Sequence, residues 1–259
     1  MSTERTENIE TTSPVASLPV LVLGGLAIFA GVLLSTILLP MWLPGLTGSI
    51  TGESPKVFWY LSRGSAMVAF VLLWASMAIG LLITNKLSRL WPGGPAAFDL
   101  HQFTSLLGLG FALFHATILI GDEYIHFDLI RVLLPFASQD YKPVWVGLGQ
   151  IGFYVWGVLV ASFYVRKKIG NKAWRWIHFS SFLTFALVMI HGISSGTDTQ
   201  TMGASVMYWL AGSSLLFLLY YRIFVTIGAS RAKQTASRQV LTRSMPAQSK
   251  KEASTQAGD

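Results

Sequence analysis

Residues 174–198, WRWIHFSSFLTFALVMIHGISSGTD, place two histidines inside an apolar run that is long enough to cross a membrane. Residues 176–197 carry no formal charge. As a helix these 22 residues are about 33 Å long, and the hydrocarbon core of a bilayer is about 30 Å thick. An ionisable side chain at that depth is costly unless something binds it. His178 and His191 are therefore candidate functional residues.

A second charge-free run, residues 100–121, repeats this arrangement with His101 and His115. Four of the five histidines of the chain thus lie in two apolar segments, at intervals of 14 and 13 residues. A single histidine in such a segment is ordinarily a hydrogen-bonded packing residue. Four histidines at nearly equal spacing in two segments indicate a shared function.

The composition is that of an integral membrane protein. Of the 259 residues, 52% are hydrophobic and 12% are charged, whereas about 25% are charged in a typical soluble domain. Six long apolar runs predict an all-α, polytopic membrane protein built as a six-transmembrane-helix bundle. The expected helices cover residues 18–42, 57–84, 100–121, 143–165, 176–197 and 205–221.

The flanking segments and the basic residues predict the domain organisation and the orientation. Residues 1–17 and 228–259 are polar, and we expect them to be disordered cytoplasmic tails around one membrane domain, residues 18–227. Of the 19 Lys and Arg residues, 15 fall in residues 1–17, in the second and fourth connections and after residue 221. The positive-inside rule then places both termini in the cytoplasm of a multi-pass cell (inner) membrane protein. The net charge of +7 needs no nucleic-acid partner, because the basic residues flank membrane spans.

Several chemistries are excluded by what the sequence lacks. The chain has no cysteine, which excludes disulfides, thiolate-held iron–sulfur clusters and covalent haem attachment. Gly147, Gly149 and Gly152 spell the dinucleotide fingerprint G-x-G-x-x-G, but no strand precedes them, and we interpret them as a helix-packing motif. His126 stands among acidic residues in an expected outer loop, and we interpret it as a hydrated loop residue.

The predicted orientation sets the depth of each histidine. The third and fifth apolar runs both pass from the cytoplasm outward. His101 and His178 should therefore lie near the inner face, and His115 and His191 nearer the outer face. Two facing imidazoles can hold a planar iron macrocycle such as haem. An interval of 14 residues is about 21 Å along a helix, so two such groups fit one above the other.

The third run can face both sites with one side of its helix. At about 100° per residue, His115 returns to within about 40° of the direction of His101. Gly108 lies seven residues from each histidine, with Gly110 close by. A small residue there would allow close approach either of a macrocycle or of a neighbouring helix.

The fifth run fits less simply. Its 13-residue interval places His178 and His191 about 140° apart on an ideal helix. Either the two sites contact different sides of this helix, or the helix is locally irregular. Ser180, Ser181 and Thr184 are candidates to assist by bonding to backbone carbonyls.

The six apolar runs resemble the ferric reductase-like transmembrane domain. The resemblance is carried by two segments that begin and end with histidine, HQFTSLLGLGFALFH (residues 101–115) and HFSSFLTFALVMIH (residues 178–191). That superfamily includes NADPH oxidases, ferric-chelate reductases and the haem-bearing membrane subunit of the bacterial methionine sulfoxide reductase system. The resemblance covers residues 18–225 and implies two b-type haems (heme b) that carry electrons across the membrane. It places the inner haem on His101 and His178 and the outer haem on His115 and His191. Few residues follow the sixth run, so we expect no flavin and nicotinamide domain of the kind found in the oxidases.

Basic and aromatic residues near the histidines are candidates for supporting roles. Arg63 at the outer end, and Arg175 and Lys172 at the inner end, could pair with haem propionates. Snorkelling of their charges to lipid headgroups explains these positions nearly as well. Phe182 and Phe185 would fall between the two haems, either as packing residues or as an electron relay.

The leading hypothesis is an oxidoreductase component that transfers electrons outward. Its partners would be the lipid bilayer, a separate flavin reductase or quinol as donor, and an outer-side oxidoreductase, ferric iron or dioxygen as acceptor. The alternative is a haem-free transporter or proton-conducting protein that uses buried histidines as relays. A visible spectrum separates the two hypotheses.

Overall fold

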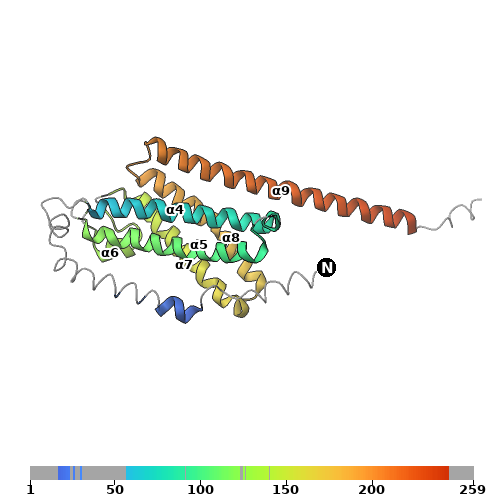
Figure 1. The fold of residues 1–259 in the computed structure, drawn as a ribbon, viewed down its shortest axis with the longest axis horizontal. Helices are drawn as coiled ribbons and strands as arrows, with labels where there is room; N and C mark the ends of the chain where they lie inside the picture. Colours follow the sequence, from blue (N-terminus) through green and yellow to red (C-terminus); the bar gives the residue numbers. More distant parts are fainter. Residues whose placement is uncertain are drawn as a thin grey trace, which may run out of the picture. The chain divides into compact units, whose positions relative to one another are not determined.

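The computed structural model describes residues 17–23, 26, 30, 57–90, 92–122, 125, 127–139 and 141–244. Within these residues the chain is all-helical and has no strand. Five of the described helices are long and apolar enough to cross a membrane, which confirms the predicted all-α membrane fold. They are α4 (Val57–Thr84), α5 (Gly94–Ile118), α7 (Pro143–Ile169), α8 (Asn171–Ser195) and α9 (Met202–Ser244), as Figure 1 shows.

The six-helix count is not confirmed, because most of the expected first helix, residues 18–42, lies outside the described residues. Residues 18–23 of that run are helical. Nearly all of the expected N-terminal tail, residues 1–17, lies outside them as well, as do residues 245–259 and His126.

Four helices extend beyond the apolar runs that predicted them. α5 begins six residues before residue 100, α7 ends at Ile169 and not at 165, and α8 begins at Asn171 and not at 176. α9 continues to Ser244, so residues 228–244 are helical where a disordered tail was expected. Charge limits how much of a helix lies in hydrocarbon, but backbone hydrogen bonding continues into the polar interface. An apolar run therefore underestimates the length of its helix.

Four of the helices form two hairpins. α4 packs on α5, and α7 packs on α8. The connection between α4 and α5 contains a short 3-10 helix, η1 (Leu87–Arg89). Gly170 alone separates α7 from α8, and its φ of 81° is a conformation that a side chain would disfavour. Contacts between the hairpins are sparser than contacts within them. The backbones of α5 and α8 therefore do not pack closely on one another.

The core joins the two hairpins to the start of α9. Phe70 on α4 is buried, and its ring stacks on Phe185 of α8 with 5.8 Å between ring centres. The same ring meets Tyr208 of α9 edge-on at 4.9 Å. The indole nitrogen of Trp74 donates a 2.9 Å hydrogen bond to the Ser214 hydroxyl. Many apolar side chains on the outside are exposed, as expected for helices whose outer faces meet lipid.

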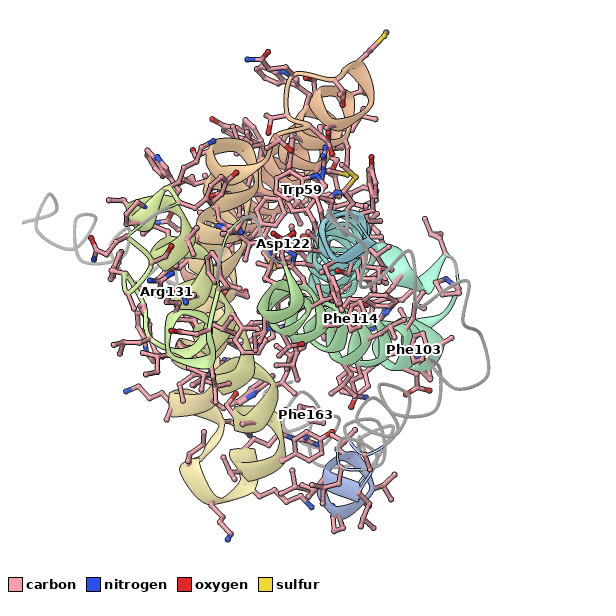
Figure 2. The ribbon with its side chains drawn as sticks, turned by 90° about the vertical axis from the view of Figure 1, so that its left-hand side faces the viewer. Trp59, Phe103, Phe114, Asp122, Arg131 and Phe163 are labelled. Carbon is pink, nitrogen blue, oxygen red and sulfur yellow. The ribbon has the colours of Figure 1, made fainter. Side chains whose placement is uncertain are left out.

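A short helix, α6 (Leu129–Leu133), closes one end of the bundle, which faces the viewer in Figure 2. The amide of Gln150 donates to the carbonyls of Arg131 at 2.7 Å and Val132 at 2.8 Å. The Tyr154 hydroxyl donates to the carbonyl of Leu133. Three consecutive carbonyls of α6 are thus satisfied by side chains of α7, which compensates for the missing next turn of this helix.

Candidate functional site

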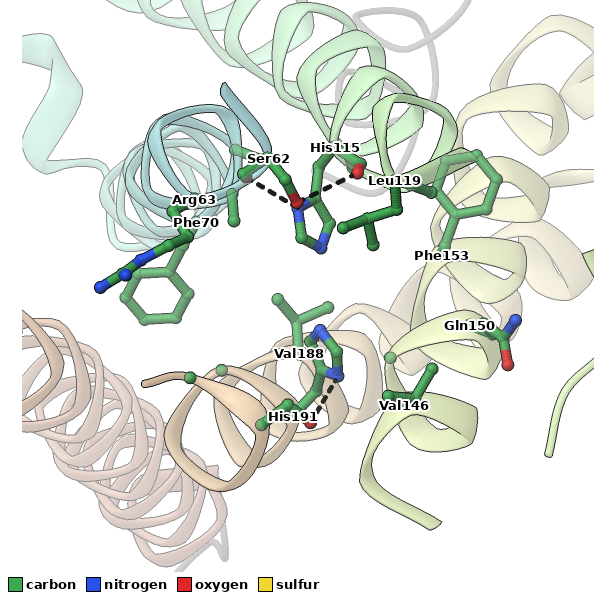
Figure 3. A pocket seen from close by; sticks show the side chains of 18 of the residues that line it. Ser62, Arg63, Phe70, His115, Leu119, Val146, Gln150, Phe153, Val188 and His191 are labelled. Carbon is green, nitrogen blue, oxygen red and sulfur yellow. Dashed lines mark hydrogen bonds between the residues drawn. The ribbon is translucent and has the colours of Figure 1, made fainter. Parts of the chain in front are cut away.

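The structure brings the four predicted histidines together as two facing pairs between α5 and α8. The ring centres of His101 and His178 are 6.2 Å apart, with 71° between the ring planes. Those of His115 and His191 are 6.3 Å apart, with 66° between the planes. Figure 3 shows His115 and His191 pointing at one another across an open space. The pairing at equal height, which the parallel direction of α5 and α8 predicted, is the pairing found.

Three of the four rings are held from behind by a backbone carbonyl. Nδ1 of His101 lies 2.9 Å from the carbonyl oxygen of Ser76, and Nδ1 of His115 lies 2.8 Å from that of Ser62. His191 makes the same contact with Trp145 at 2.9 Å. A carbonyl only accepts hydrogen bonds, so each Nδ1 must carry the proton and donate it. The other nitrogen, Nε2, then keeps a free lone pair for a ligand.

These carbonyls are reachable because a small residue follows each of them by four positions. Ser76 is followed by Gly80 and Trp145 by Gly149; Ala66 stands in the same place after Ser62. A Cβ at Gly149 would lie 2.6 Å from Cγ of His191, and one at Gly80 would lie 3.3 Å from Cε1 of His101. A larger side chain would occupy the space that the imidazole needs to reach the carbonyl.

Two serines that contact the histidines of α5 were not predicted from the sequence. Ser62 and Ser76 are 14 residues apart on α4, the same interval that separates His101 from His115 on α5. Their hydroxyl oxygens lie 3.0 Å and 3.1 Å from Nδ1 of their histidines, close to the carbonyls described above. The repeated interval was visible in the sequence. Serine is nevertheless common in membrane helices, so only the packing distinguishes these two.

His178 is held differently. Its ring stacks on the indole of Trp174, one turn earlier on α8, with 5.1 Å between centres and 25° between planes. Within the described part of the chain, no hydrogen bond to this ring is found. The indole nitrogen of Trp174 is buried and has no hydrogen-bond partner among the described residues.

The 13-residue interval is accommodated without interrupting α8, which is α-helical from Asn171 to Ser195. Two of the three side chains expected to bond backbone carbonyls do so. The Ser180 hydroxyl donates to the carbonyl of Ile177 at 2.7 Å, and the Thr184 hydroxyl donates to that of Ser180 at 3.2 Å. Thr184 is fully buried.

Gly108 and the glycines of the G-x-G-x-x-G sequence have packing roles. A Cβ at Gly108 would lie 2.8 Å from the ring of Trp156, so this residue admits a neighbouring tryptophan. The G-x-G-x-x-G sequence lies on α7, as predicted, and each of its glycines admits a side chain from elsewhere in the chain. The three contacts are Gly147 with Phe136, Gly149 with His191, and Gly152 with Val188.

A largely apolar cavity of about 250 Å³ lies beside the pair of His115 and His191. Arg63 belongs to its wall, as predicted for a residue near this site, but its guanidinium pairs with Asp198 and lies 5.3 Å from the centre of the Trp59 ring. The positive charge of Arg63 in the cavity wall is therefore offset by the carboxylate of Asp198.

The two basic candidates at the other end are less closely placed. Arg175 and Lys172 are exposed on α8, and in the described part of the chain no contact joins either of them to the pair of His101 and His178. Phe185 is buried in the core, whereas Phe182 is partly exposed. Phe185 packs in the core, which is one of the two alternatives predicted for it.

Comparison with protein-family models, with curated proteins and with solved structures finds no match for this chain. The chemistry of the site therefore rests on its own geometry.

Proposed function

We propose that this protein is a diheme b-type electron-transfer protein, the membrane component of an oxidoreductase of ferric reductase-like type. The inner haem would be held by His101 and His178, and the outer haem by His115 and His191. Electrons would enter from a cytoplasmic flavoprotein or a quinol and leave to an acceptor on the outer side. A bound haem supplies reversible one-electron chemistry.

The separation of the paired rings carries this proposal. A metal–imidazole bond is about 2 Å long, so two imidazoles on opposite sides of one metal ion have ring centres about 6 Å apart. Two imidazoles joined by a direct hydrogen bond of about 3 Å would have ring centres about 5 Å apart. The observed 6.2 Å and 6.3 Å fit a shared metal better than direct contact.

The donor set favours a macrocycle over a bare ion. Each pair offers two imidazole nitrogens, and among the described residues no group of three or more His, Cys, Asp or Glu side chains could hold a metal. A metal between two imidazoles must then bring its other ligands with it, as haem iron does.

The residues of the chain have definable tasks in such a site. The carbonyls of Ser76, Ser62 and Trp145 hold three histidines in the tautomer that binds iron. The largely apolar walls of the cavity beside His115 and His191 would limit the access of water to a haem held there. α5 runs parallel to α8, and the two histidines of α5 are about 21 Å apart along its axis. One site would then lie near each face of a bilayer.

The distribution of Lys and Arg indicates which site would face the cytoplasm. Most Lys and Arg residues lie in the tails and in the connections α4–α5 and α7–α8, so these parts belong in the cytoplasm by the positive-inside rule. The pair of His101 and His178 then lies near the cytoplasmic face. We place the protein in the cell membrane with both termini inside.

A visible spectrum tests the proposed function. Full-length protein, purified in detergent after expression with ample haem, should show six-coordinate low-spin b-type haem that sharpens on reduction with dithionite. Extraction with acid acetone should yield about two haems per chain, because each histidine pair holds one. A folded but colourless preparation would contradict the proposal and favour the haem-free transporter.

A further inference from the structure

The two histidine pairs differ in how their rings are supported. In the pair of His115 and His191, both rings donate Nδ1–H to a backbone carbonyl. In the pair of His101 and His178, only His101 does so. His178 instead stacks on Trp174, and the described residues offer its ring no hydrogen bond.

Hydrogen bonding of an axial imidazole changes the iron that it binds. An imidazole that donates Nδ1–H to a carbonyl is more basic and a stronger electron donor. Stronger donation stabilises the oxidised iron and lowers its reduction potential. A site with two such ligands is therefore harder to reduce than a site with one.

The charges at the two ends act in the same direction. The end with His101 and His178 carries Arg166, Lys167 and Lys168 on α7 and Arg175 on α8, against one described carboxylate, Asp99 on α5. At the other end, Arg63 pairs with Asp198, and the other described cations, Arg131 and Lys142, are equalled in number by Asp122 and Asp128. Positive charge stabilises the reduced form, which carries one positive charge less. The cationic end should thus have the higher potential.

We propose that stacking on Trp174 replaces the hydrogen bond at His178, and that the inner haem consequently has a higher reduction potential than the outer haem. This inference rests on the proposed function and adds to it which of the two haems has the higher reduction potential. Trp174 acts as a positioning residue, because it touches the ligand and not the iron.

The order has a consequence for the direction of transfer. The first electron that enters a fully oxidised protein resides mainly on the inner site. Outward transfer is then unfavourable by the potentials of the two sites alone. Net flow requires an oxidant on the outer side that removes each electron as it arrives.

A redox titration of purified full-length protein, followed by its visible spectrum, tests the order. We expect two one-electron transitions. His115→Ala should remove the outer haem and leave the transition at higher potential, and His101→Ala should leave the one at lower potential. The reverse assignment, or two transitions at the same potential, would overturn the inference while the proposed function stands. A preparation without haem would overturn both.

Variants of Trp174 test the positioning role. Trp174→Leu removes the stacking and exposes Nδ1 of His178 to water, an acceptor, so the inner transition should shift to lower potential. The low-spin EPR signal of that site should also change, because it depends on the relative orientation of the two imidazole planes. Trp174→Phe retains an aromatic ring and should retain the wild-type potential and signal.

Trp176 provides the matched control. It is a tryptophan on the same helix, two residues away, but it is exposed and contacts Phe179. Trp176→Leu should leave both transitions unchanged. Wild-type potentials and signals in Trp174→Leu, or an equal shift in Trp176→Leu, would overturn the positioning role. Should Trp174→Leu fail to fold, a changed potential in Trp174→Phe would overturn it as well.

Discussion

At the scale of single residues, the proposed function makes each histidine one of the two ligands of a haem, so changes to the two members of a pair should have the same effect. We expect His115→Ala and His191→Ala to remove the same haem and to leave identical spectra with about half the haem content. His126→Ala, which changes the fifth histidine of the chain, is the control and should retain full content. Different residual spectra in the two variants would show that the pairing is wrong.

The glycine behind His191 gives a second prediction at this scale. In Gly149→Ala the new Cβ would lie 2.6 Å from the imidazole, so the ring must move away from the Trp145 carbonyl. We expect loss of outer haem, measured as haem content and as a missing redox transition, with the inner haem retained. Gly110→Ala is the control, because nothing lies within 4 Å of a Cβ at that position. Full outer haem in Gly149→Ala would refute this account of the close approach.

At the scale of elements, α6 depends on α7 for the hydrogen bonds of its last turn. Gln150→Leu leaves the carbonyls of Arg131 and Val132 without their donor, at a cost of about 1–3 kcal/mol for each carbonyl that stays buried. We therefore expect faster hydrogen exchange over residues 127–139 in detergent. Tyr154→Phe removes one donor and should have a smaller effect. Exchange rates equal to wild type in Gln150→Leu would show that other contacts hold α6.

At the scale of the whole molecule, the described residues contain membrane-length helices, short connecting helices and no strand. A nicotinamide site of the dinucleotide-binding kind requires a strand before its glycine turn, and here the glycine motif lies inside α7. We expect that the purified chain alone oxidises neither NADH nor NADPH. Haem reduction should begin when a flavin reductase or a quinol is added. Reduction by NADPH without either addition would reveal a site elsewhere in the chain.

The sequence by itself determined the membrane class, five of the expected helices and the grouping of the histidines. These properties are local or periodic: a charge-free run longer than a bilayer core becomes a spanning helix, and intervals of 14 and 13 residues place His101 with His178 and His115 with His191 once both helices run the same way. The lengths of the helices were underestimated, because hydrophobicity reports the part in lipid and not the hydrogen-bonded helix.

Only the tertiary structure decided which groups support the histidines. The carbonyls of Ser62, Ser76 and Trp145 carry no signal in the sequence, since every residue has a carbonyl, and access to each depends on the neighbouring helix. The pairing of Arg63 on α4 with Asp198, which follows α8, likewise depends on where side chains from separate parts of the chain meet. Such contacts arise from the packing of all the helices together, and no interval along one helix encodes them.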